Sequence, residues 1–155
     1  EEGMKLWASC KGCLESEERF AHMTDDEFST FMQASVLAGM AIAYTGTSIP
    51  HGLSYTLTYE NGVPHGKAVG VFLSGFLKKY GDSTEVEYVV KQLLGFDDID
   101  ALRDYIRTLF GKLDMSEKLW KKDRDGILAN PAKLKNYPFG LTADMLDDYV
   151  RYYNA

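Results

Sequence analysis

Apolar residues recur at helical spacing along almost the whole chain, and no long run alternates apolar and polar residues as an antiparallel sheet would. The pattern predicts a first helix over residues 4–14 and a charged connector over 15–23. Thr24 and Glu27 form a capping box, which opens a long helix predicted to reach Tyr44. These elements favour an all-α fold.

The long helix is apolar around much of its circumference from Phe28 onward. Several of its residues are small enough to let neighbouring helices approach closely, namely Ala34, Ser35, Ala38, Gly39 and Ala41. A helix that is apolar on most sides is normally enclosed by other helices. We therefore expect this helix to lie in the centre of a helical bundle.

The rest of the chain predicts more helices, which start near Pro50, Pro64, Asp82 and Asp97, after Asp123, and at Thr142. The third and fourth of these carry single apolar stripes and should lie on the surface of the bundle. A break is predicted at Asn130-Pro131. One helical domain over 1–155 accounts for the pattern. Because the chain opens on Glu-Glu-Gly within an amphipathic segment, we expect a fragment of a longer protein.

Composition narrows the classes of function. The chain has 155 residues, of which 45% are apolar and 26% charged, as in ordinary globular domains. Its net charge of -6 and the absence of a basic cluster argue against a nucleic-acid partner. No apolar run is long enough to span a membrane and no signal peptide is evident, so a cytoplasmic protein is expected. Cys10 and Cys13 lack a second cysteine pair and are interpreted as reduced thiols.

Two of the three histidines occupy matching Pro-His-Gly tripeptides, at His51 and His65. Each falls in the first turn of a predicted helix, where the positive end of the helix dipole keeps an imidazole neutral and able to bind a metal. The spacing of the two residues permits them to converge without requiring it. Two histidines that merely cap helices or pack in a core would look the same. A metal would also need a third ligand, for which Glu60 and His22 are weak candidates.

The segment MQASVLAGMAIAYTGTSIPHGLSYTLTYENGVPHGKAVGVFL, residues 32–73, resembles the core of the C-terminal helical domain of the iron-dependent (group III) alcohol dehydrogenases, a dehydroquinate synthase-like fold. Residues 125–150 resemble the closing segment of that domain, and EEGMKLW is similar to its early helix. The resemblance implies that His51 and His65 are ligands of a divalent metal, with Fe(II) favoured and Zn(II) as the other candidate.

The resemblance further implies a reaction and partners. The remaining metal ligands and an N-terminal nucleotide-binding domain that holds NAD(P) would lie upstream of residue 1. The parent enzyme would transfer a hydride between a small alcohol or aldehyde substrate and the nicotinamide ring. This domain would contribute two metal ligands and a wall of the substrate cleft, and would be inactive alone. A surface around residues 45–66 left without its partner is expected to form a homodimer.

One residue departs from the family pattern. Many members carry a further histidine four residues after the first metal ligand, where this chain has Tyr55. Tyr55 is thus a candidate catalytic residue that relays the alcohol proton, or a packed aromatic. The other tyrosines, including Tyr149, Tyr152 and Tyr153, are expected to pack in the core.

Two alternatives remain. The first is a helical interaction module without catalysis, in which His51 and His65 only cap helices. The second is a zinc enzyme of the glycerol dehydrogenase type, which is disfavoured because its second histidine usually lacks the Pro-His-Gly setting found at 64–66.

Overall fold

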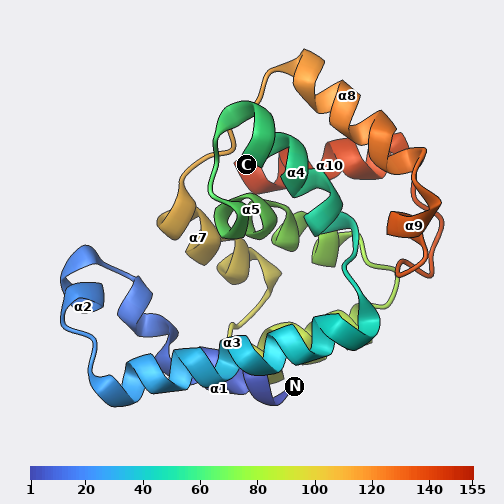
Figure 1. The fold of residues 1–155 in the computed structure, drawn as a ribbon. Coiled ribbons are helices and arrows are strands. Elements are labelled where there is room, and N and C mark those ends of the chain that lie inside the picture. The colour runs from blue at the N-terminus through green and yellow to red at the C-terminus, as the bar shows by residue number, and fades with distance from the viewer.

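The computed structural model describes all residues 1–155, and its regular elements are all helical, as predicted (Figure 1). In chain order the elements are α1 (Glu2–Cys10), the 3-10 helix η1 (Lys11–Leu14), α2 (Glu17–Ala21), α3 (Asp25–Thr45), α4 (Ile49–Asn61), α5 (His65–Lys78), α6 (Ser83–Glu87), the π-helix η2 (Tyr88–Leu93), α7 (Ile99–Phe110), α8 (Glu117–Leu128), α9 (Pro131–Leu134) and α10 (Ala143–Asn154). None of the helices has both the length and the apolar character needed to cross a membrane.

Side-chain caps explain where most of the helices begin. The Thr24 hydroxyl accepts from the Glu27 amide while the Glu27 carboxylate accepts from the Thr24 amide, so the predicted capping box is confirmed. Predicted caps at Asp82 and Thr142 are confirmed as well, and Asp98 caps α7. These local hydrogen bonds satisfy amides that have no partner inside the helix.

Two predicted boundaries were wrong. The helix placed after Asp123 begins at Glu117, because the Ser116 hydroxyl accepts from the Leu119 amide and caps it there. The connector predicted over 15–23 contains the short helix α2, which Ser16 caps in the same way. Both errors concern serine caps that lie next to charged residues.

Residues 49–155, here called the body, contain the hydrophobic core. A single cluster of 15 buried residues joins the helices of this region: Ile49, Leu53, Leu57, Ala68, Val71, Phe72, Val90, Leu102, Ile106, Trp120, Ile127, Tyr137, Leu146, Tyr149 and Tyr153. Helix α5 lies at its centre and packs against α4, α7 and α10. Tyr149 and Tyr153 are fully buried, which confirms that these two tyrosines pack in the core, whereas Tyr152 is only half-buried and its hydroxyl donates to the Asp100 carboxylate at the surface. Helix α7 buries one stripe only, Leu102 and Ile106, and lies at the surface as predicted.

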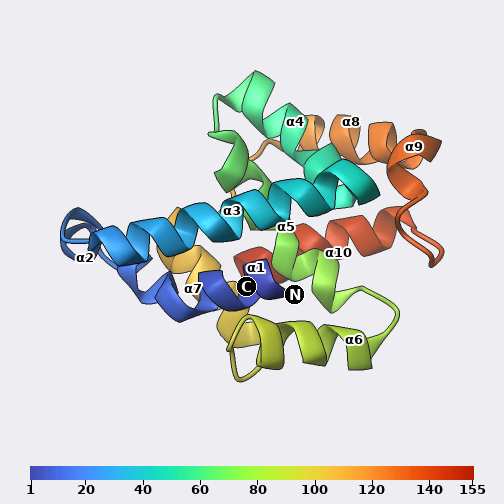
Figure 2. The same cartoon turned by 60° about the horizontal axis from the view of Figure 1, so that its bottom comes forward.

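Residues 1–45, here called the arm, correct the prediction for the long helix. Helix α3 lies on the outside of the molecule rather than in its centre, and α1 is its main partner (Figures 1 and 2). Of its 21 residues only Ala34 is buried. Large apolar side chains of α3 face solvent, namely Phe28, Met32, Val36, Leu37, Met40, Ile42 and Tyr44. The apolar pattern correctly marked a surface suited to burial, but these residues do not contain the elements that would enclose it.

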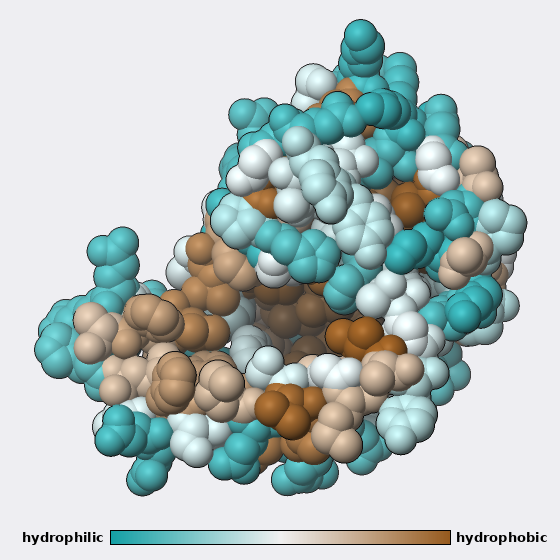
Figure 3. Space-filling view, in the orientation of Figure 1, coloured by the Kyte–Doolittle hydropathy of each residue, from teal (hydrophilic) through white to brown (hydrophobic).

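A small junction holds the arm to the body. The Trp7 ring lies 6.4 Å from that of Phe96 and 5.9 Å from that of Tyr105, measured between ring centroids. The Lys11 ammonium donates to the Leu94 carbonyl at 3.1 Å, and the Tyr105 hydroxyl donates to the Lys11 carbonyl at 2.8 Å. At the far end of α3 the Asn136 side chain donates to the Thr45 carbonyl at 2.8 Å, and between these contacts a hollow with apolar walls separates the two regions (Figure 3).

Candidate metal centre

Two prolines start the helices that carry the candidate ligands. Pro50 lies in the first turn of α4, and Pro64 precedes the first residue of α5. Between the two helices, Gly62 takes a left-handed conformation with φ 68°, and the Val63 amide donates to the Leu57 carbonyl. This turn leads the chain back beside α4. His51 and His65 therefore start two helices that pack against each other.

The two imidazoles converge. Their ring centroids lie 5.5 Å apart at an interplanar angle of 61°. Metal–nitrogen bonds of about 2.1 Å place an ion roughly 3.2 Å from the centroid of each ligating ring, so two rings on one tetrahedral ion lie about 5.2 Å apart. The observed separation is thus compatible with two ligands of one ion. Neither ring hydrogen-bonds to a main-chain carbonyl, whereas His22 Nδ1 lies 2.8 Å from the Glu18 carbonyl.

Ser54 orients the His65 ring. Its hydroxyl is fully buried, donates to the His51 carbonyl at 2.8 Å and lies 3.4 Å from His65 Nδ1. Because its one proton is already donated, the hydroxyl can only accept from Nδ1, so the proton of His65 belongs on that nitrogen. Nε2 of His65 then carries the free lone pair that a metal requires.

The surroundings of His51 favour its neutral form. The ring is half-buried, and this burial lowers the pKa of His51, with further lowering by the adjacent His65 and by Lys133. A neutral imidazole offers a lone pair to a cation, whereas a protonated one repels it. The electrostatic setting of His51 therefore suits a metal ligand.

Tyr55 lies against the same pair. Its ring stacks on His65 with centroids 6.1 Å apart and an interplanar angle of 10°. The Tyr55 hydroxyl accepts from the Lys133 ammonium at 3.5 Å, and that ammonium also lies 5.0 Å from the centre of the Tyr55 ring. Tyr55 is thus exposed at the site rather than packed in the core.

The C-terminal segment clamps the loop that leads into the site. Asn136 Nδ2 donates to the carbonyls of Thr45 and Thr47, at 2.8 and 3.2 Å, and Lys133 donates to the Thr47 hydroxyl at 3.0 Å. Gly46 lies between the two threonines with φ 72°, a conformation that favours glycine. These bonds connect α9 to the start of α4 across more than eighty residues of sequence.

The glycines of the two Pro-His-Gly tripeptides differ in how closely other helices pack against them. A Cβ on Gly52 would lie 2.4 Å from Ile127 Cδ1 and about 3.5 Å from the Lys133 stem, so α4 approaches α8 and α9 closely there. A Cβ on Gly66 would meet nothing within 4 Å. The two tripeptides are therefore alike in sequence but differ in packing: the one at 50–52 is tightly packed and the one at 64–66 is open.

No third histidine, cysteine, aspartate or glutamate joins the pair in a group that could hold a metal ion. Glu60 pairs with Lys122, and His22 lies in the arm, so neither weak candidate completes the shell. Cys10 and Cys13 are both free and buried in the arm, as expected for reduced thiols. The structure therefore brings two potential metal ligands together and adds no third from this chain.

Sequence reasoning missed Ser54, Lys133, Thr47 and Asn136. Ser54 could have been found, because it lies one helical turn after His51. The other three carried no local signal, since their importance depends on how α9 folds back onto the loop at 45–48. Tertiary contacts alone bring them to the histidines.

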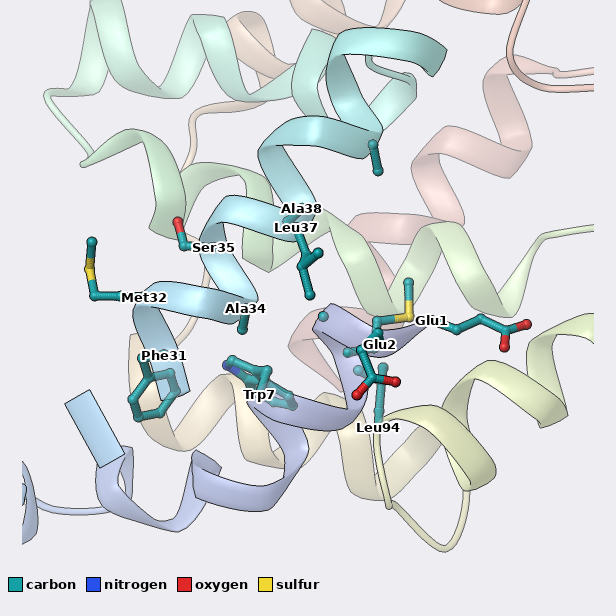
Figure 4. Close-up of a pocket in the computed structure, with 13 residues that line it drawn as sticks. Glu1, Glu2, Trp7, Phe31, Met32, Ala34, Ser35, Leu37, Ala38 and Leu94 are labelled. Carbon is teal, nitrogen blue, oxygen red and sulfur yellow. The ribbon is translucent and has the colours of Figure 1, made fainter. Parts of the chain in front are cut away.

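A separate pocket lies in the arm. It has a volume of about 690 Å³, and most of its walls are apolar (Figure 4). Trp7 and Phe31 line it between α1 and α3, Leu94 closes it from the body, and Glu1 and Glu2 lie at its edge. It shares no residue with the histidine pair.

The sequence was compared with models of known protein families. The family model described as "Fe-containing alcohol dehydrogenase family, C-terminal" matches residues 16–125, which is more than two-thirds of the chain and includes both histidines. The closing segment beyond residue 125 lies outside the match. No curated protein and no solved structure was found to match this sequence.

Proposed function

This chain belongs to the Fe-containing alcohol dehydrogenase family, whose C-terminal domain it represents, and on that premise we propose that it supplies two metal ligands and one wall of the substrate cleft to a metal-dependent alcohol dehydrogenase. The observation that carries the proposal is the convergence of His51 and His65, with ring centroids 5.5 Å apart. The lowered pKa of His51, caused by burial, and the contact of Ser54 with His65 Nδ1 support it further.

His51 and His65 would hold the divalent ion, with Fe(II) favoured by the family and Zn(II) suited equally well by two imidazoles. When bound, the ion supplies Lewis acidity toward an alcohol or carbonyl oxygen. NAD(P) would be held by an N-terminal domain of the same parent enzyme and would accept or deliver the hydride. Residues 1–155 would therefore be inactive alone.

The residues of this chain would prepare that reaction. Ser54 holds the proton of His65 on Nδ1, and so keeps Nε2 available. The Tyr55 hydroxyl would accept the alcohol proton while it releases its own proton to solvent, a role that its exposure beside the histidine pair supports. Asn136 fixes the loop at 45–47 that forms the adjacent wall of the cleft.

The remaining ligands would come from protein outside these residues. The exposed apolar face of α3 supports this source, because no charged residue occurs between Phe28 and Tyr59 and the helix leads directly to the loop before His51. A helix that packed on this face could reach the histidine pair. A homodimer through the surface at 45–66 is the competing arrangement, and sedimentation of the chain at high concentration distinguishes the two.

The alternative of a non-catalytic interaction module predicts a different setting for the two histidines. It requires His51 and His65 only as caps or core residues, each bonded to a main-chain group. The observed bonds favour the metal proposal, because the ring nitrogens contact no carbonyl and the two rings lie side by side with centroids 5.5 Å apart.

Metal titration tests the proposal. Calorimetric titration with Zn(II), and with Fe(II) under anaerobic conditions, should show binding that the double substitution His51→Ala, His65→Ala weakens at least tenfold. His22→Ala is the matched control, because this third histidine lies in the arm and should leave the affinity unchanged. Equal affinities for the double variant and the unmodified chain would remove the metal assignment.

A further inference from the structure

Lys133 is an ammonium group without an anionic partner at the edge of the histidine site. It lies in the short helix α9, which the Asn130 side chain caps at the predicted Asn-Pro break. The aliphatic stem of Lys133 lies against Gly52, so the packing of α4 directs the side chain towards the loop at 45–48. The residue is half-buried, which makes the position of its charge well defined.

The ammonium of Lys133 contacts neutral groups only. It donates to the Thr47 hydroxyl at 3.0 Å and to the Tyr55 hydroxyl at 3.5 Å. None of the ion pairs of the molecule includes it. The chain has 23 acidic against 17 basic residues, so carboxylates are plentiful, yet none pairs with this lysine.

No carboxylate pairs with Lys133 or joins the two imidazoles, and Asp123, on the neighbouring helix α8, is bound to Thr56 instead. The segment that contributes Thr47, His51 and Tyr55 carries no Asp or Glu. Lys133 is near enough to His51 to help lower its pKa. With a divalent ion on the imidazoles, two positive centres would lie side by side without a counter-charge from this chain.

We propose that Lys133 binds a carboxylate of the substrate, so that this site takes alcohols and aldehydes that carry a carboxylate, such as ω-hydroxy acids. The inference rests on the proposed function. The carboxylate would accept from the Lys133 ammonium and from the Thr47 hydroxyl, while the alcohol end of the molecule lies toward His51 and His65.

A carboxylate fits these donors better than a phosphate ester. A phosphate carries close to two negative charges at neutral pH and normally takes several charged or main-chain donors. Lys133 is a single ammonium flanked by two hydroxyls, which matches the single charge and two oxygens of a carboxylate. Tyr55 contributes an apolar ring on which a short carbon chain can lie.

Binding of matched probes to the Zn(II)-loaded chain tests the inference. Glycolate, 3-hydroxypropanoate and 4-hydroxybutanoate are each compared with the diol of the same carbon count, and the ring signals of His51 and His65 are followed by NMR. At least one hydroxy acid should bind about tenfold or more tightly than its diol, a typical effect of one charge-assisted hydrogen-bonded pair.

Variants of two neighbouring lysines show whether Lys133 causes the preference for the hydroxy acid over the diol. Lys133→Gln should abolish it, Lys133→Arg should retain most of it, and Lys135→Gln is the control because Lys135 is exposed and makes no ion pair. Circular dichroism confirms that each variant is folded. A hydroxy acid that binds no better than its diol, or a preference that survives Lys133→Gln, overturns the inference.

Failure of the inference and of the proposed function are distinguishable. Zn(II) binding is measured first, without probe, so a chain that binds Zn(II) through its histidines but shows no carboxylate preference loses only the role of Lys133. If Zn(II) affinity is unchanged by the His51→Ala, His65→Ala double substitution, the assignment of a metal centre to these residues is wrong. A carboxylate preference that then persists and depends on Lys133 still supports this residue as the anion contact.

Discussion

The body and the arm use similar apolar helices in opposite ways. The body buries its apolar faces against one another around α5, and every residue of the core cluster comes from this region. The arm, which is nearly a third of the chain, has only Cys10, Cys13 and Ala34 buried and carries nine of the thirteen exposed large hydrophobic residues. A high apolar content therefore indicates a surface suited to contact, and burial depends on whether a partner element is present.

The candidate site lies in the body, which is also the better packed of the two regions. His51, His65 and Ser54 lie on helices that also contribute Leu53, Leu57 and Ala68 to the core, so the site rests on the rigid part of the fold. The arm depends on a small junction for its position. We therefore expect the arm to open without unfolding the site.

The largest expected effect comes from one matched pair of phenylalanines. Phe72→Ala should lower the free energy of unfolding by about 3–5 kcal/mol, because its side chain is 1% exposed in the core. Phe28→Ala in the arm should cost less than about 0.5 kcal/mol, because that side chain is 60% exposed. Urea denaturation measures both. Similar losses for the two variants would show that the arm is as well packed as the body.

The two tryptophans provide a second test. Trp7→Ala should lower the free energy of local opening of the arm by about 2 kcal/mol, which makes amide exchange there roughly thirtyfold faster, because Trp7 packs on Phe96 and Tyr105. Amides of α5 should keep their protection. Trp120→Ala should instead weaken the whole body, since that ring stacks on Phe72. Hydrogen exchange followed by mass spectrometry separates these outcomes; faster exchange in α5 of the Trp7 variant would contradict the expectation.

Two carboxylates should give the regions opposite pH dependence. Burial raises the pKa of Asp123 in the body to about 6, with Thr56 as a partial compensation, and one of its oxygens has no hydrogen-bond partner. In the arm, the Cys13 thiol, the Thr24 amide and hydroxyl, and Arg19 lower the pKa of Glu27 to about 2.

The signs follow from the protonated and ionised forms that the fold prefers. Folding favours protonated Asp123, so its contribution is greatest below about pH 4 and is lost as the pH rises through 6. Asp123→Asn should therefore raise the free energy of unfolding at pH 7 by about 1–2 kcal/mol, after allowance for partial hydration. Folding favours ionised Glu27, whose contribution is present above about pH 4.5 and is lost as the pH falls through 2.

Denaturation at several pH values checks both signs. The Asp123→Asn variant should lose the decline between pH 4 and 6, while Glu27→Gln should lower the stability of the arm at every pH above about 4.5, with a difference that shrinks as the pH falls towards 2. A variant of Asp123 that is no more stable at pH 7 than the unmodified chain would show that this carboxylate is well solvated.

The smallest expected effect concerns Ser54. Ser54→Ala should let the His65 proton move between its two nitrogens and weaken Zn(II) binding by at most about tenfold, or about 1.4 kcal/mol, because the bond to Nδ1 is long at 3.4 Å. Nitrogen-15 shifts of the imidazole report the tautomer directly. Ser35→Ala is the control in the arm and should change neither quantity. An unchanged tautomer in the Ser54 variant would remove its orienting role.

Local patterns predicted the helices well and the site in part. The capping box at Thr24 and the caps at Asp82 and Thr142 were correct because each involves residues within one turn. Convergence of His51 and His65 was allowed by the sequence but not required by it, since it depends on the course of the chain around Gly62. The metal role assigned to them remains a prediction.

The prediction for α3 failed for a physical reason. The uncharged stretch of α3 from Phe28 onward indicates that this face avoids water, but it gives no information about which element covers the face. Here α1 covers one side only. Burial is a property of two surfaces, whereas apolar periodicity describes one.

The sequence by itself determined the helical class, most helix starts and the identity of the two candidate ligands, because backbone hydrogen bonds and caps act between residues that are close along the chain. The tertiary structure alone decided that α3 lies outside the core, that Ser54 meets His65, and that Lys133 meets Tyr55 beside the histidines. Contacts across long separations depend on how the packed helices pass one another, and this follows from the balance of burial over the whole chain.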